Sequence, residues 1–460
     1  MDFSAANTEL WNPLLQVCVL GIMILLANII RKRVPFVKKS MMPTAVIAGF
    51  LLLVLKLVGI VKLDNDFMEA ITYHFIAIGF IALSLRVPEK DDGAKKGLIG
   101  LKSGGIIVST YLIQGICGLL ISMGLGLTFM PKMFKAAGIL LCLGFGQGPG
   151  QANNTGSTYE TTWGFVGGRS FGLALAAAGY VCACVVGVII LEILRKRKQL
   201  EKVDHDEISG SVTVDTFQSE KEIPISESID RFSIQIALVL AVYLVSYFFI
   251  KVVTDLLSAY APGVGNLLNG LLWGFNFIIG SAFAVLARVL LAKLNKEKIV
   301  RHQYQNGYLL SRLSGFAFDV MIVAGLGSIE PEDIKGLWLP FTLMVIAGAV
   351  VTYFHLKYVC KKVYPDYYYE GLVSMYGMLT GTISSGILLL REIDPNFKTP
   401  ASNNLVLGSS FAILFGAPVL VLIGLAPQSD MMCGLAILAC LIYYLILMFF
   451  ICRKAKKAEA

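Results

Sequence analysis

Long apolar stretches recur along almost the whole chain, and they restrict its fold more than any other feature. Each stretch is roughly 20 residues long, the length that an α-helix needs to cross the hydrocarbon core of a bilayer. Hydrophobic residues make up 56% of the chain and charged residues only 15%, whereas soluble domains carry ~25% charged residues. The sequence therefore predicts an all-α polytopic membrane protein and argues against a soluble enzyme.

Eleven stretches are long and apolar enough to be predicted as membrane spans. They are residues 10–30, 42–61, 67–85, 101–129, 165–194, 232–257, 267–294, 308–329, 337–359, 404–425 and 431–451. Basic clusters follow alternate stretches, and cytoplasmic loops are enriched in Lys and Arg. We therefore expect a multi-pass protein of the cell membrane with its N-terminus outside and its C-terminus in the cytoplasm. The net charge of +8 lies in these clusters, so we expect contact with membrane lipids and no nucleic-acid partner.

Two polar, glycine-rich segments interrupt the apolar pattern. The first, "GFGQGPGQANNTGSTYE", spans residues 144–160, and the second begins with "GMLTGTISSG" at residue 377. The apolar run before the first segment is too short for a span, and the basic clusters require the chain to enter and leave on the same side. Irregular backbone at membrane depth is tolerated only inside protein or beside a water-filled cavity. The sequence predicts re-entrant hairpins around 136–160 and 370–400.

The order of elements is the same in two halves of the chain. Residues 1–195 and 232–425 each contain five predicted spans and one re-entrant hairpin, and residues 196–231 form a hydrophilic cytoplasmic linker. Residues 426–460 add one transmembrane helix and a basic tail. An odd number of crossings in each half orients the halves oppositely. Inverted repeats with interrupted hydrophobic segments at matching places indicate a secondary transporter.

Several motifs resemble the bacterial sodium/glutamate symporter family. They are "MMPTAVIAGF" in the second span, "HFIAIGFIALSL" in the third, the glycine-rich segment of each half, and "GTISSGILLLREIDPNFKTPASNNLV". The resemblance implies two inverted domains of five spans, re-entrant loops that meet from opposite sides, a homodimer, and sodium-driven uptake of glutamate. The family's first loop typically carries a Gly-Gly-His-Gly-Thr type motif, whereas the corresponding "GFGQGPGQANN" has no histidine.

Most of the candidate ligands are neutral side chains that carry oxygen, and these are concentrated in the two interruptions. Unwound carbonyls with hydroxyl and amide oxygens bind sodium without burying an extra charge. The candidates for Na+, the expected coupling ion, are Gln147, Ser157, Thr380 and Asp319. The candidates for a small anionic substrate are Gln151, Asn153, Asn154, Thr155, Thr382, Ser384, Ser385, Arg169 and Arg312. The alternative interpretation is that both segments are packing loops with small residues at helix contacts.

Three of these candidates are charged, and each has a structural alternative. A carboxylate at mid-span costs at least ~2.5 kcal/mol, so a role for Asp319 is the default hypothesis. Arg312 lies two turns earlier, and the pair could instead form a structural ion pair. Arg169 follows the first interruption and could equally be solvated at the outer surface.

The sequence thus predicts a sodium-coupled symporter of glutamate or a related anionic amino acid. The alternative is a transporter of a dicarboxylate or hydroxycarboxylate, driven by sodium or by protons. We expect no enzyme activity and no cofactor, since the chain has no HExxH motif. A third possibility is a passive channel, which uptake of the substrate against its concentration gradient would exclude.

Overall fold

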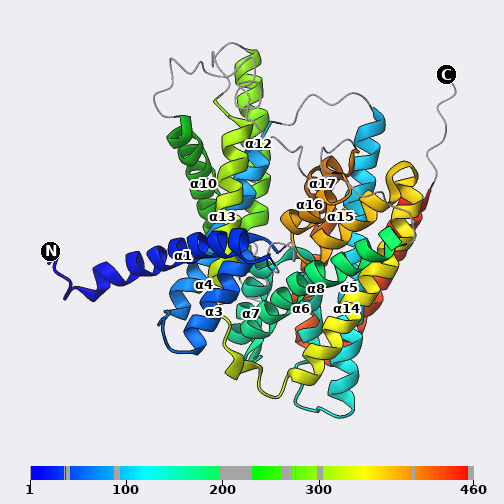
Figure 1. Ribbon diagram of the computed structural model, residues 1–460, viewed down its shortest axis with the longest axis horizontal. Helices are drawn as coiled ribbons and strands as arrows, with labels where there is room; N and C mark the ends of the chain where they lie inside the picture. The colour runs from blue at the N-terminus through cyan, green and yellow to red at the C-terminus, as the bar shows by residue number, and fades with distance from the viewer. Residues whose placement is uncertain are drawn as a thin grey trace. The chain divides into compact units, whose positions relative to one another are not determined.

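The computed structural model describes residues 2–35, 37, 42–87, 94–196, 231–260, 269, 272–274, 276–297, 304–394 and 399–453. Within these residues the protein is helical and has no strand (Figure 1). Ten of the described helices are long and apolar enough to cross a membrane. The predicted all-α, multi-pass architecture is therefore confirmed.

The helices follow most of the predicted spans to within a few residues. The long helices are α1 (Thr8–Arg33), α4 (Asn65–Leu85), α5 (Ala94–Leu127), α8 (Gly168–Lys196), α10 (Arg231–Tyr260), α12 (Asn276–Lys296), α13 (Gly307–Gly327), α14 (Trp338–Val363), α17 (Ala401–Leu425) and α18 (Asp430–Cys452). The expected linker falls on residues 197–230 and most of the basic tail on residues 454–460, which lie outside the described residues.

The second predicted span, 42–61, is shorter than expected. Its helix, α3 (Thr44–Leu57), has 14 residues, which corresponds to about 21 Å, against a hydrocarbon core of ~30 Å. Pro43 precedes its first turn, and Gly59 has a positive φ of 77° just beyond its end. Apolar composition alone did not reveal these two helix boundaries.

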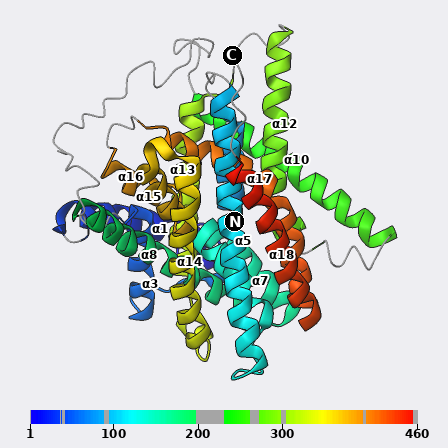
Figure 2. The same ribbon diagram turned by 90° about the vertical axis from the view of Figure 1, so that its right-hand side faces the viewer.

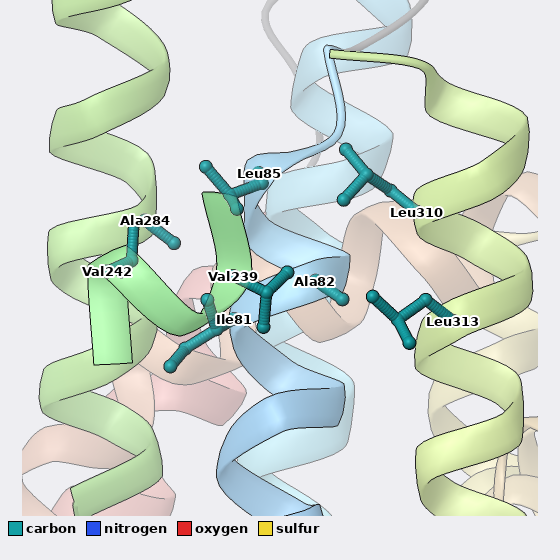
Figure 3. Close-up of a cluster of buried hydrophobic side chains, with 8 residues drawn as sticks. All are labelled: Ile81, Ala82, Leu85, Val239, Val242, Ala284, Leu310 and Leu313. Atoms are coloured by element: carbon teal, nitrogen blue, oxygen red, sulfur yellow. The ribbon is translucent and has the colours of Figure 1, made fainter. Parts of the chain in front are cut away.

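The described helices form two compact units. Unit 1 contains α1 up to Leu20, α4, α10, α12 and α13 up to Gly325. Its apolar core is formed by side chains from α4, α10, α12 and α13 (Figure 3): Ile81, Ala82, Leu85, Val239, Val242, Ala284, Leu310 and Leu313. A polar contact ties α12 to the end of α4, because Arg288 donates to the carbonyl oxygens of Ser84 and Arg86.

Unit 2 contains the remainder of α1, α3, α5, α8, α14, α17 and α18, and all of the short helices between them. The short elements are η1 (Lys135–Ile139), α6 (Leu140–Cys142), η2 (Leu143–Gln147), α7 (Pro149–Trp163), η4 (Pro331–Ile334), η5 (Pro365–Tyr367), α15 (Tyr368–Thr380), α16 (Ile383–Arg391) and η6 (Ala426–Gln428). Helix α5 packs against α14, α17 and α18, and Figure 2 shows α14 and α18 flanking it.

Each unit combines elements from both halves of the sequence. Helix α4 of the first half packs with α10 and α12 of the second half in unit 1, and α5 packs with α14 and α17 in unit 2. The boundaries of the compact units therefore differ from the predicted repeat boundaries at 195 and 232. The repeats themselves stay a prediction.

Candidate functional site

The first polar interruption breaks a helix at Gly148. Elements α6 and η2 form a short helical run that ends at Gln147, and α7 begins at Pro149. Gly148 has φ 90° and ψ −178°, a conformation that is essentially restricted to glycine. Proline suits the next position because the first N–H of a helix has no intrahelical partner. The "GQGPG" sequence therefore stops one helix and immediately starts another.

The second interruption breaks a helix at Gly381 and Thr382. Helix α15 ends at Thr380, and α16 begins at Ile383. Thr382 is extended, with φ −140° and ψ 174°, and its side chain makes no capping hydrogen bond within the described chain. Helices α15 and α16 pack against each other and against α8 and α17 (Figure 1). The start of α16 therefore leaves backbone N–H groups without a side-chain cap.

The two breaks meet inside unit 2. A Cβ atom built on Gly148 would lie 3.8 Å from Thr382 Cγ2. Gly179 of α8 contacts both segments, since a Cβ there would collide with the Thr380 carbonyl oxygen and would lie 3.2 Å from Phe145 Cδ2. The close approach of α8 requires glycine at position 179. Two segments more than 230 residues apart in the sequence thus share one site.

Helix ends of both polarities lie at this site. The C-terminal ends of η2 and α15 present carbonyl oxygens, which carry partial negative charge, and the N-terminal ends of α7 and α16 present N–H groups with partial positive charge. Residues 144–158 and 377–388 contain no charged side chain. Backbone dipoles therefore dominate the electrostatics of the break segments, and they suit a cation and an anion at neighbouring positions.

Several predicted site residues carry buried oxygens that accept no hydrogen bond from any residue the structure describes. They are Gln151 Oε1, Asn153 Oδ1, Thr155 Oγ1, Thr382 Oγ1 and Ser385 Oγ. Buried polar atoms are nearly always hydrogen-bonded in proteins, so a group of orphan acceptors requires an explanation. A cation or a hydrogen-bond donor at the breaks would satisfy them.

The remaining predicted residues of the break segments lie nearby. Gln147 is half-buried at the end of η2, and Asn154 and Ser157 follow on α7. The Thr380 hydroxyl donates to the Tyr376 carbonyl oxygen at 2.8 Å, which leaves its lone pairs free to accept. Ser384 occupies the second position of α16, and its side chain lies outside the described ones.

Arg169 lies away from the breaks. It is the second residue of α8, and its Cα packs beside Gly156, about 12 Å along α7 from the break at Gly148. Its backbone N–H donates to Glu160 Oε1 at 3.2 Å. Arg169 therefore lies at the start of α8, beside α7, and not at the breaks.

Arg312 and Asp319 lie on α13 in unit 1, whereas both breaks belong to unit 2. Both side chains are exposed, and the Arg312 guanidinium lies over the Tyr308 ring at 5.1 Å. In the described part of unit 1 they do not form the ion pair that the sequence offered as an alternative. The functional roles considered for these two residues stay predictions.

Gln114 of α5 is a residue at the site that sequence reasoning missed. Its side chain is fully buried, and its Nε2 donates to the Leu379 carbonyl oxygen at 2.9 Å and to Thr352 Oγ1 at 2.7 Å. A Cβ built on Gly146 would lie 3.0 Å from Gln114 Oε1. Gln114 therefore contacts both break segments. A polar residue inside an otherwise apolar span was the signal that could have revealed it.

Comparison with protein families decides the class. The profile described as "Sodium/glutamate symporter" matches residues 11–363, more than three quarters of the chain. The chain belongs to the sodium/glutamate symporter family. This is a family of transporters and not of enzymes, as the sequence predicted, and it implies sodium as the coupling ion. The match includes Gln114 and the first break and ends at the end of α14, before α15 and α16. A comparison with curated proteins found no match.

Proposed function

We propose that this member of the family takes up glutamate, or a related anionic amino acid, through the cytoplasmic membrane in symport with sodium. The observation that carries the proposal is the meeting of two broken helices in unit 2, with orphan oxygens and helix ends of both polarities. A carboxylate and a sodium ion require these two kinds of partner. The family match supports both ligands.

In this proposal both breaks contribute to both ligand sites. Sodium is held by exposed carbonyl oxygens and the oxygens of Gln147, Ser157 and Thr380, and Asp319 is a further sodium candidate. The N-terminal N–H groups of α7 and α16 face the substrate carboxylates. The side chains that complete the substrate site are Gln151, Asn153, Asn154, Thr155, Thr382, Ser384 and Ser385, with Arg169 and Arg312 as the candidate cationic partners.

The proposed transport cycle moves unit 2 as one body, because both breaks belong to it. The breaks would be the tips of re-entrant hairpins from inverted repeats, and the protein would work as a homodimer with its C-terminus in the cytoplasm. Sodium and substrate each stabilise the loaded site, so each raises the affinity for the other. This reciprocity is the source of coupling.

Uptake by the purified protein in proteoliposomes tests the proposal. An inward sodium gradient should drive accumulation of radiolabelled glutamate, whereas an equal potassium gradient should not. Unlabelled aspartate and citrate serve as competitors, and stronger inhibition by citrate than by glutamate would identify a hydroxycarboxylate transporter instead. Glutamate uptake at the same rate with and without the sodium gradient would refute sodium coupling.

Asn153→Ala tests the assignment of the site. Asn153 is fully buried, and its Oδ1 has no hydrogen-bond partner among the described residues, so we expect the variant to fold and to lose most uptake. Asn404→Ala is the matched control, because Asn404 is also buried but its Nδ2 already donates to the Tyr367 hydroxyl. Equal sodium-driven uptake by both variants would contradict the assignment.

A further inference from the structure

Gln114 is set apart from the candidate ligands of the break segments by its position. It lies on α5, outside both broken helices. Residues Leu98–Leu127 of this helix form a candidate membrane span. The side chain is fully buried and reaches Leu379, at the end of α15, and the neighbourhood of Gly146, in η2. One amide group therefore touches the C-terminal ends of both helical runs that stop at the breaks.

The orientation of this amide is determined by its partners. Both N–H bonds of Nε2 are used, one toward the Leu379 carbonyl oxygen at 2.9 Å and one toward Thr352 Oγ1 at 2.7 Å. A flipped amide would place two carbonyl oxygens against each other at Leu379 and would lose that hydrogen bond. Oε1 must therefore point away from Leu379.

The oxygen that is left over is an acceptor without a donor. Gln114 Oε1 is buried and accepts no hydrogen bond within the described structure. It faces Gly146, and the Tyr111 ring lies against the same glycine. The peptide groups in this region belong to the ends of helical runs, where carbonyl oxygens and not N–H groups lack intrahelical partners. A buried oxygen in an environment rich in carbonyls suits a cation.

We propose that Gln114 Oε1 is a sodium ligand, supplied by α5 to the ion that binds at the two breaks. The inference rests on the proposed sodium coupling and adds a ligand from outside the break segments. Tyr111 and Gln114 pack so closely against Gly146 that a Cβ there would collide with the Tyr111 ring, and packing this tight leaves no room beside the glycine for the substituted ammonium group of an amino acid. Through its Nε2 the same amide holds the end of α15, so an ion at Oε1 connects the first break to the second.

Two substitutions separate the oxygen from the N–H groups of this amide. Gln114→Met removes both and keeps a similar length, whereas Gln114→Glu keeps an oxygen at the same place and removes the N–H donors. Gln114→Asn shortens the side chain by one methylene group and so moves the oxygen away from the proposed ion. This variant is used in place of Gln114→Met if Gln114→Met cannot be purified. Gln235→Met is the matched control, because Gln235 of unit 1 is equally buried but its Oε1 accepts from the Asn306 N–H at 3.0 Å and its Nε2 donates to the Tyr304 carbonyl oxygen.

Sodium titrations of the full-length protein provide the readout. Thermal stability in detergent is measured with increasing NaCl against KCl at constant ionic strength and without substrate, and half-saturating sodium for uptake is measured in proteoliposomes. We expect Gln114→Met or Gln114→Asn to raise the half-saturating sodium concentration about tenfold or more in both assays. Gln114→Glu should remain within about threefold of the parent protein or bind sodium more tightly, and Gln235→Met should titrate as the parent does.

The outcomes distinguish this inference from the proposed function. If the parent protein responds to sodium and Gln114→Met titrates identically, Gln114 is only a structural bridge and the inference is overturned. The same conclusion follows if Gln114→Glu and Gln114→Met lose sodium affinity equally, because the N–H groups and not the oxygen would then matter. If the parent protein shows no sodium response in either assay, sodium coupling and the inference are both overturned. A sodium-dependent stability shift without glutamate uptake contradicts only the cargo.

Discussion

Gly148 is the residue at which backbone conformation has the clearest consequence for the site. Its φ of 90° and ψ of −178° separate η2 from α7, so α7 begins at the place where the two breaks meet. A side chain there has room, since the nearest atoms to a Cβ would be Thr382 Cγ2 at 3.8 Å and Tyr180 Oη at 3.9 Å. The requirement for glycine at this position is conformational.

We expect Gly148→Ala to cost about 1–3 kcal/mol of stability, because alanine rarely adopts this backbone conformation. Relaxation of the strain would also redirect α7, so sodium-driven uptake should fall by more than the loss of folded protein explains. Thermal unfolding in detergent and uptake per folded molecule measure the two effects. Gly416→Ala on α17 is the control, since a Cβ there has no neighbour within 4 Å in the described structure; equal behaviour of both variants would contradict the prediction.

The chemistry of single residues did not identify all of the residues that lie at the site. It directed attention to Asp319 and Arg312 because buried charge is costly in a membrane, and both lie in unit 1 on α13. It passed over Gln114, a neutral residue whose importance comes from three contacts with segments at least 32 residues away in the sequence. The neutral amides and hydroxyls of each break are close together in the sequence, so the sequence pattern was enough to group them as candidates.

At the scale of elements, α5 and α14 are joined by polar contacts along much of their length. Ser103 contacts the hydroxyl of Tyr364, the residue that follows the last turn of α14, at 2.6 Å. His355 contacts Ser109 Oγ at 3.0 Å, and Gln114 donates to Thr352. Hydrogen bonds between transmembrane helices add modest stability each, on average ~0.6 kcal/mol. These contacts hold α14 beside the helix that carries Gln114.

His355→Phe tests whether this set of contacts is structural. The substitution removes the contact with Ser109 and the contact with the Tyr444 hydroxyl of α18 at 3.2 Å, while it preserves an aromatic ring. We expect a loss of about 1 kcal/mol in stability with no change in half-saturating sodium, because His355 does not touch the breaks. A large change in sodium dependence without a change in thermal stability would instead assign His355 to the transport site.

At the scale of the whole molecule, the two compact units combine the two halves of the sequence. Lys56 of α3 pairs with Glu330, which precedes η4, at 2.8 Å, and both residues belong to unit 2. The pair joins a helix of the first half to a loop of the second half. If unit 2 moves as one body, the distance between these residues stays constant during transport.

A cross-link between positions 56 and 330 should therefore be tolerated. We propose the double substitution Lys56→Cys and Glu330→Cys in a background from which the nine native cysteines have been removed. After reaction with a short thiol-specific cross-linker, uptake should remain close to that of the unlinked double variant, which is the control. Loss of uptake on linking would show that α3 and the Glu330 segment move relative to each other, and it would contradict a rigid unit 2.

The sequence by itself determined the elements and their class. Apolar length predicted ten of the membrane helices, and local chemistry predicted both breaks, because Gly, Pro and uncapped polar residues end helices through contacts with their immediate neighbours. The family also followed from motifs within the first and second halves. Helix α3 was the exception, since its ends depend on Pro43 and on a positive φ at Gly59.

Only the tertiary structure decided which elements form a unit and which polar groups meet. The nearness of Gly148 to Thr382, the approach of α8 through Gly179 and the bridge made by Gln114 all involve residues that are distant along the chain. Apolar helices in a membrane do not select partners by hydrophobicity, because lipid is as apolar as another helix; close packing of small residues and hydrogen bonds selects them. Those interactions depend on the three-dimensional positions of single atoms, which the order of residues does not display.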